Sequence, residues 1–118
     1  MNETIAFDKN KIDSIHTRSN RREVSITDPS TIDIILDDLA KLELRQRKYE
    51  SDMNKSTRSV TGGKYYIELE DRGELVELIY LSGNLVTFYG YSTGETTVYE
   101  IANDPVLEFP GIFHSLQE

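Results

Sequence analysis

The sequence contains no cysteine and few basic residues, with 13 Lys and Arg against 21 Asp and Glu. The absence of cysteine excludes disulfides, thiol catalysis and cysteine-based zinc sites, so the fold must depend on packing and hydrogen bonds. No apolar run approaches the ~20 residues that a membrane-spanning helix requires. The N-terminal segment MNETIAFDKNK also lacks the apolar core of a signal sequence. The chain as given is therefore expected to be soluble.

The net charge of −8 argues against nucleic acid as a partner, because an acidic protein repels the phosphate backbone. Basic residues do cluster at two places, Arg18, Arg21 and Arg22 in the first and Arg45, Arg47 and Lys48 in the second. Acidic residues are interleaved nearby, which favours solvated loops or strand edges over an anion site.

Motifs that would indicate catalysis are missing. The two histidines, His16 and His114, lie far apart in the sequence. Gly62-Gly63-Lys64 lacks the full phosphate-loop spacing and precedes a predicted strand, so no helix N-terminus follows to bind phosphate. No serine lies in a G-x-S-x-G elbow, and no calcium-loop spacing occurs. The sequence therefore indicates no catalytic residue, no cofactor and no metal, and it favours a protein that is not an enzyme.

A chain of 118 residues is within the range of one domain. Residues 1–10 are polar and are expected to be disordered, which leaves residues 11–118 as a single domain. Strand signals at 11–18 and 22–26, joined by a turn at 19–22, predict an N-terminal hairpin.

Beyond this hairpin the hydrophobic pattern changes to that of a helix. Asp28 is suited to cap the free N–H groups of a helix start, and Pro29 fits the first helical position. One face of the predicted helix, from 29 to about 43, is apolar through Ile32, Ile35, Leu36, Leu39 and Leu42. Asp33, Asp37 and Asp38 are expected on its solvated side.

Residues 43–49 are open to two interpretations, an extension of the helix or a short strand. We favour the strand, because no further apolar position continues the helical pattern after Leu42. Residues 51–63 have almost no apolar content, and a loop of that length is usually functional or disordered.

Residues 63–101 predict an antiparallel meander of four strands, each closed by a turn that contains glycine. The second strand, from Leu75 to Leu81, is apolar on both faces, with Leu75, Ile79 and Leu81 sharing one of them. It is expected at the centre of the sheet, covered on both sides for part of its length. We therefore predict an α+β fold in which one main helix packs on a mostly antiparallel sheet.

The end of the chain is expected to be less regular. Pro110 lacks a backbone N–H and would confine residues 106–111 to a sheet edge or a bend. Residues 111–118 are compatible with one short helical turn that docks on the core through Ile112, Phe113 and Leu116.

Six of the seven tyrosines lie on the predicted meander. Tyrosine has a large rigid ring with a polar tip, which suits contacts with a partner, although strands also use aromatic residues for ordinary cross-strand packing. The candidate binding residues are Tyr66, Tyr89 and Tyr91. Gly90, opposite the last two, leaves a gap through which a neighbouring group could approach closely.

Paired carboxylates suggest a rival function. Glu68 and Glu70 share one face of a strand, about 6.5–7 Å apart. That spacing is compatible with acid and base catalysis, but it occurs in any strand with a solvated face. A hydrolase or isomerase would also need a cleft between helix and sheet that holds a buried acid with a perturbed pKa.

Several segments together resemble small extracytoplasmic domains of Gram-positive bacteria, many of them lipoproteins of unknown function. The resemblance covers about residues 11–102 and is carried by the TDPSTIDIILDDLAKL helix after a strand, Y-x-I-x-L at 65–69 and V-Y-x-I at 98–101. It implies an α+β domain held outside the cell by a lipid anchor in the full-length protein. These motifs are structural, so they transfer no functional residue.

The leading hypothesis is a non-enzymatic binding module, extracytoplasmic and membrane-anchored in the full-length protein. Its contact surface would be the open sheet face or the 51–63 loop, and its partner a protein or a cell-wall glycan. One alternative is the carboxylate enzyme at Glu68 and Glu70. The other is a cytoplasmic acidic inhibitor or phage-type protein that presents acidic residues to a basic partner.

Overall fold

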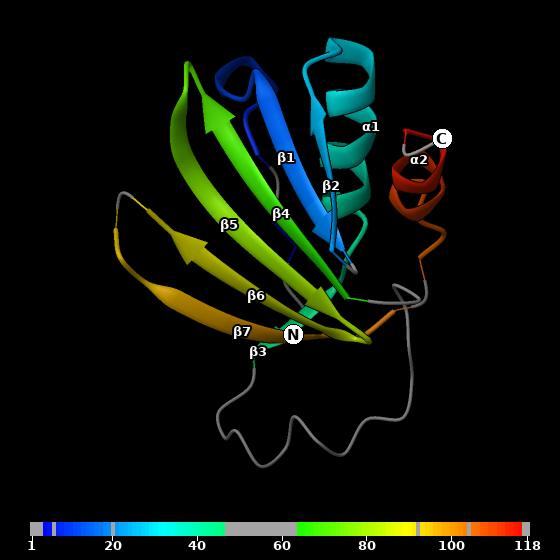
Figure 1. Cartoon of the computed structure of the whole chain (residues 1–118). Helices are drawn as coiled ribbons and strands as arrows, with labels where there is room; N and C mark the ends of the chain where they lie inside the picture. Colours follow the sequence, from blue (N-terminus) through cyan, green and yellow to red (C-terminus); the bar gives the residue numbers. More distant parts are fainter. Residues whose placement is uncertain are drawn as a thin grey trace.

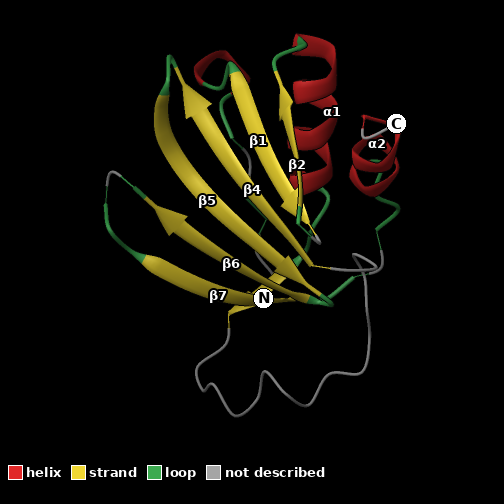
Figure 2. Ribbon diagram, viewed as in Figure 1, coloured by secondary structure: helices red, strands yellow, loops and turns green. Residues whose placement is uncertain are grey.

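A seven-stranded sheet with two α-helices on one of its faces forms the described part of the chain (Figures 1 and 2). The computed structural model describes residues 4–5, 7–19, 21–46, 64–91, 93–103 and 105–116. The elements in chain order are η1 (Lys9–Lys11), β1 (Ser14–Ser19), β2 (Arg22–Ile26), α1 (Pro29–Ala40), β3 (Leu44–Gln46), β4 (Lys64–Asp71), β5 (Glu74–Ser82), β6 (Leu85–Gly90), β7 (Thr96–Ile101) and α2 (Phe109–Leu116).

The strand order is β2-β1-β4-β5-β6-β7-β3, and every pair of neighbours is antiparallel. The predicted α+β fold, with an N-terminal hairpin, a helix and a meander, is therefore confirmed. Strand β5 occupies the central position, as predicted. The predicted cover on both sides is wrong for the described residues, because both α-helices lie on the same face of the sheet (Figure 2). Residues 44–46 pair with residues 99–101 of β7, which confirms a strand there rather than a longer helix. Residues 47–49 of that predicted strand lie outside the described residues.

Helix α1 begins where the sequence indicates. The Asp28 side chain accepts a hydrogen bond from the Thr31 backbone N–H at 3.0 Å, and Pro29 occupies the first turn. The helix ends at Ala40, a little before the predicted residue 43. Leu42 is nevertheless buried, because the chain turns back onto the sheet directly after the helix.

The core lies between the inner face of the sheet and the two helices. Strands β1, β4, β5, β6 and β7 each contribute at least one fully buried aliphatic side chain to it, among them Ile15, Ile67, Ile79, Val86 and Ile101. The apolar face of α1 covers these side chains with Ile32, Ile35, Leu36 and Leu39. Alternation along the strands places the remaining side chains on the outer face.

A β-bulge changes the faces of the central strand. Leu69 pairs with Glu77, but the next residue of β4, Glu70, pairs with Leu75, so Val76 is an extra residue in β5. The prediction that Leu75 shares a face with Ile79 and Leu81 is wrong, and Leu75 is 39% exposed. Glu77 lies on the inner face, two residues before the buried Ile79, as simple alternation requires, and the bulge changes the face of Leu75.

The C-terminal segment is more helical than predicted. Helix α2 begins at Phe109, and Pro110 lies in its first turn, where a missing N–H costs no hydrogen bond. Phe113 is buried, as predicted, and Ile112 is half-buried. The side chain of Leu116 lies outside the described residues. Tyr65 meets Phe109 and Phe113 edge-on, with ring centroids 4.7 and 5.6 Å apart.

The buried carboxylate of Asp38 connects the two helices. It accepts hydrogen bonds from the backbone N–H groups of Glu108 (2.9 Å) and Phe109 (2.6 Å) at the start of α2. Lys41 donates to the same carboxylate at 3.0 Å and to the Val106 carbonyl at 3.2 Å. The prediction that Asp38 belongs to the solvated side of α1 is wrong, because its residue exposure is 2%.

Part of segment 1–10, expected to be disordered, packs against the domain. Residues 9–11 form the short helix η1, capped by the Asp8 side chain. The Phe7 ring lies 6.3 Å from that of Phe88 on β6. Residues 1–3 and 6 lie outside the described residues. Within the described ranges, neither α-helix has the length and apolar character to cross a bilayer.

Replacing Asp38 by Ala should lower the free energy of unfolding by about 2 kcal/mol, because two N–H groups of α2 lose their acceptor. Asp38→Asn keeps one acceptor oxygen and should cost less. Urea denaturation followed by circular dichroism measures both changes. Asp33→Asn, on the exposed side of the same helix, is the control and should change stability little; equal effects of the Asp33 and Asp38 substitutions would contradict the assigned contact.

Candidate functional site

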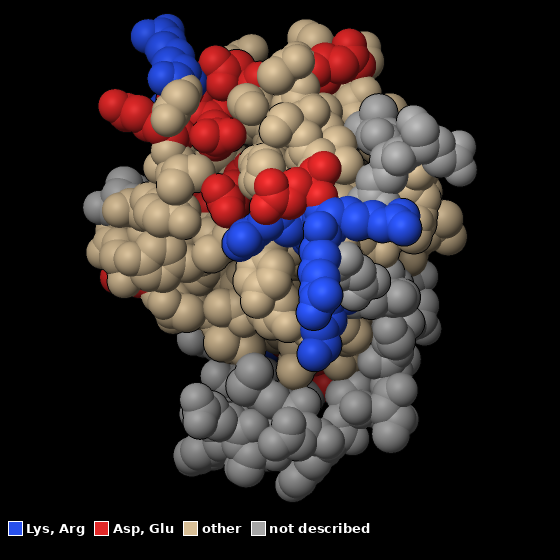
Figure 3. Space-filling model, in the orientation of Figure 1, with Lys and Arg blue, Asp and Glu red and all other residues tan. Residues whose placement is uncertain are grey.

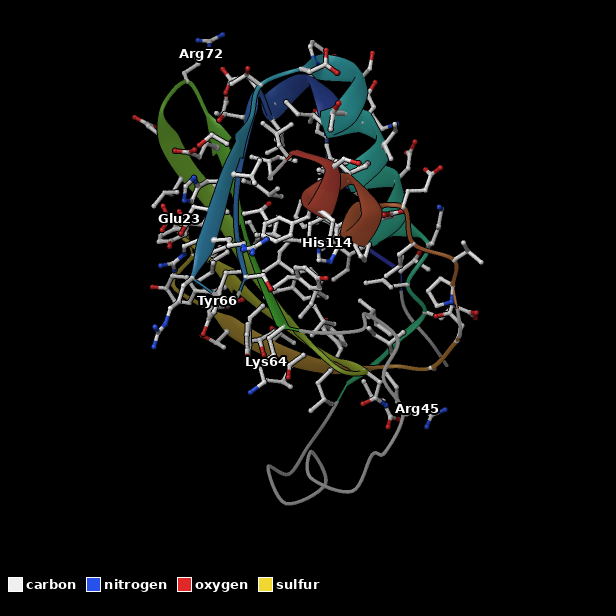
Figure 4. All side chains as sticks on the ribbon, turned by 45° about the vertical axis from the view of Figure 1, so that its right-hand side comes forward. Glu23, Arg45, Lys64, Tyr66, Arg72 and His114 are labelled. Atoms are coloured by element: carbon white, nitrogen blue, oxygen red, sulfur yellow. The ribbon has the colours of Figure 1, made fainter. Side chains whose placement is uncertain are left out.

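The outer face of the sheet carries the three tyrosines predicted from the sequence. Tyr66 pairs with Tyr80 across β4 and β5, and Tyr89 pairs with Leu78 across β5 and β6. Both helices lie on the other side of the sheet, and Tyr66 projects away from α2 and His114 (Figure 4). Tyr66 and Tyr91 are each 40% exposed, so this face presents aromatic surface to the solvent.

Tyr66 stands between two neighbours. Its ring stacks on that of Tyr80, with centroids 4.5 Å apart and planes inclined by 25°. From the opposite neighbouring strand, the Arg18 guanidinium lies 5.2 Å from the centre of the Tyr66 ring. Since β1 and β5 lie on opposite sides of β4, both faces of this ring are occupied. Tyr66 therefore offers its edge and its hydroxyl to a partner.

Tyr89 and Tyr91 form a second aromatic pair, with centroids 5.1 Å apart and planes at 85°. Gly90 between them faces the other side of the sheet. A Cβ atom built there would be 2.8 Å from Thr93 Oγ1 and 3.6 Å from a carboxylate oxygen of Glu77. The close approach predicted at Gly90 is thus made by the same chain, and it requires glycine.

Charged side chains surround the aromatic residues on the outer face. Arg18 lies 3.9 Å from Glu68, and Arg45 is hydrogen-bonded to Glu100 at 3.3 Å. In the space-filling view, acidic and basic side chains meet across the middle of the face, and uncharged surface lies beside and below them (Figure 3).

The rival carboxylates lie on this same outer face. Glu68 pairs with Arg18, and Glu70 accepts a hydrogen bond from the Ser14 hydroxyl at 3.5 Å. Helix α1 covers the opposite side of the sheet, so no cleft between helix and sheet contains these two side chains.

A cavity on the inner face contains a different carboxylate. It has a volume of about 160 Å³ and lies between the N-terminal segment and the ends of β5, β6 and β7. We call it the Glu77 pocket; its lining consists of Ile5, Phe7, Glu77, Phe88, Gly90, Thr93, Glu95, Thr97 and Tyr99. Burial raises the pKa of Glu77 above its ordinary value of 4.5. Sequence reasoning missed this pocket, because its walls come from segments far apart in the chain, the N-terminal residues Ile5 and Phe7 and the strands β5, β6 and β7.

The loop that follows β6 shapes one wall of this pocket. The Thr93 hydroxyl donates to the Gly90 carbonyl at 3.4 Å and accepts from the Glu95 N–H at 3.2 Å. The Gly94 N–H also donates to the Gly90 carbonyl, at 2.7 Å. These bonds fix the loop with Thr93 beside Glu77.

The two histidines remain apart. His16 lies on the outer face, 3.1 Å from the Ser25 hydroxyl and 3.7 Å from Glu23, whereas His114 lies on α2 beside Phe113. Among the residues that the structure describes, no three His, Asp or Glu side chains are close enough to hold one metal ion. The 51–63 loop, the other predicted contact surface, lies outside the described residues.

No protein-family model, curated protein or solved structure matches this chain. The function is therefore inferred from the two surfaces described above.

The raised pKa of Glu77 predicts a pH-dependent stability. The folded state favours the protonated carboxyl, so ionisation as the pH rises from 4.5 through the folded pKa lowers the free energy of unfolding. Glu77→Gln should therefore stabilise the protein more at pH 7 than at pH 4.5. Thermal denaturation of both proteins across this range measures the difference, and a difference that stays constant with pH would contradict the assigned burial.

Proposed function

We propose that this domain is a non-enzymatic protein-binding module whose contact surface is the outer face of the sheet. The observation that carries the proposal is the half-exposed aromatic group formed by Tyr66, Tyr80, Tyr89 and Tyr91, on the side of the sheet opposite both helices. Single exposed apolar residues are ordinary in a soluble protein, whereas several exposed aromatic residues on one face mark an interaction surface.

The ring geometry favours a protein over a glycan. A sugar stacks on the free face of an aromatic ring, and both faces of the Tyr66 ring are occupied by Arg18 and Tyr80. Protein interfaces instead use tyrosine and arginine as rigid anchors that lose little conformational entropy. A tyrosine held between an arginine and a second ring is already ordered before a partner arrives, which reduces the cost of binding.

The location proposed for this module is outside the cytoplasmic membrane, attached through a lipid anchor in the full-length protein. The support is the resemblance of the helix start and the later strands to extracytoplasmic domains of Gram-positive bacteria. The absence of cysteine is compatible with that location, because such domains do not require disulfides.

A photo-cross-linking experiment tests the proposed surface. A photoreactive amino acid replaces Thr87, which pairs with Tyr80 on the outer face, and a second protein carries the same group at the exposed Val106 on the helix side. We expect a discrete protein adduct from source cells at position 87 and none at position 106. Substituting Tyr89→Ala and Tyr91→Ala together should reduce the adduct at position 87 at least about tenfold, because hot-spot residues each supply ~2 kcal/mol or more.

The double variant must remain folded for this comparison, which its circular dichroism spectrum checks. Glu74→Gln, at the tip of the exposed β4–β5 hairpin, is the matched control and should leave the adduct unchanged. Equal adducts at positions 87 and 106 would contradict the proposal. A glycan array run in parallel distinguishes the partner class, because glycan binding lost in the tyrosine double variant would replace the protein partner by a sugar.

A further inference from the structure

The Glu77 pocket is separate from the proposed protein-binding face, since it opens on the other side of the sheet. Its lining combines two carboxylates with three aromatic rings, those of Phe7, Phe88 and Tyr99. Phe88 lies between the other two, with centroid distances of 6.3 Å to Phe7 and 5.8 Å to Tyr99. The described lining contains no Lys or Arg. The chemistry of the pocket is therefore anionic and aromatic together.

Glu77 has no partner among the described residues that line this pocket. Within the described ranges, no hydrogen-bond donor and no basic side chain contacts its carboxylate. Partial burial of a carboxylate without a partner costs free energy, and a bound cation would offset that cost. Glu95 lines the same cavity and adds a second negative charge to the field that a ligand would meet.

We propose that the Glu77 pocket binds a small organic ammonium ion. The ammonium group would lie near the Glu77 and Glu95 carboxylates, and its alkyl part would pack on the Phe7 and Phe88 rings. Aromatic faces attract alkylammonium ions, and carboxylates accept their N–H groups. A volume of about 160 Å³ matches roughly five water molecules at ~30 Å³ each, which suits an amine with a short alkyl chain.

The same lining disfavours the other ligand classes. Calcium prefers sites with several carboxylates, and the described lining supplies only two, Glu77 and Glu95. An anion would be repelled by both carboxylates. A neutral apolar molecule would leave the Glu77 carboxylate buried without a partner.

A titration of the ¹⁵N-labelled full chain with n-butylammonium chloride, followed by NMR at pH 7 and constant ionic strength, tests the proposal. Saturable shifts are expected for the amides of Gly90, Thr93, Glu95 and Thr97. Glu77→Gln should weaken binding at least about tenfold, because the ammonium loses its charged partner. Glu95→Gln should weaken it in the same direction, and Glu68→Gln on the outer face should leave it unchanged.

Two further titrations, with n-butanol and with magnesium chloride, complete the test. The uncharged analogue n-butanol should shift these amides far less than the amine, and equal binding of the two would overturn the proposal. Magnesium chloride at the same ionic strength should not displace the amine, and displacement with shifts at the same amides would also overturn it. Affinity unchanged in both glutamine variants at the pocket would do the same.

Binding of Nα-acetyl-lysine methylamide tests whether the natural ligand is a lysine side chain or a free amine. Tighter binding of this compound than of n-butylammonium would support a lysine side chain of a protein as the natural ligand. Weaker binding would support a free amine. Neither outcome depends on the outer face, so a failure of the protein-binding proposal leaves this one intact.

Discussion

Burial of one face of the antiparallel sheet is the constraint on which the rest of the molecule depends. The inner positions of five strands are filled by aliphatic side chains from which water is excluded, and α1 supplies the matching apolar surface. With no disulfide in the chain, this burial is the main favourable term for folding. Alternation along each strand then commits the remaining side chains to the outer face. The aromatic surface is therefore determined by the same register that forms the core.

Closing this core requires polar groups as well as apolar ones. Helix α2 completes the inner layer with Phe109 and Phe113, but its first N–H groups would otherwise be buried without an acceptor. Asp38 supplies that acceptor from α1, and Lys41 neutralises its charge. A buried acidic residue is thus the condition for packing the second helix.

The sequence predicted α1 and the strands of the meander from local signals, but it missed η1 and the start of α2. Period and capping located α1 at Asp28 and Pro29, and alternation located β4 and its tyrosines. What sequence reasoning missed depends on contacts between distant residues. Asp38 has the same spacing as the solvated acids of α1, and only the start of α2, about 70 residues later, makes it a buried acceptor. The bulge at Val76 has no local signal either, and without it the exposure of Leu75 could not be predicted. The Glu77 pocket likewise depends on distant segments, since Ile5 and Phe7 line it together with β5, β6 and β7.

The sheet is open, and both of its edge strands are short. Strand β3 has three residues and β2 has five, with Arg22 and Glu23 at the start of β2. Edge strands this short offer few free hydrogen-bonding groups, and charged residues oppose pairing with another chain. Growth of the sheet from one molecule to the next is thereby discouraged, so an exposed aromatic face can be kept without the fibre formation that a long apolar edge would invite.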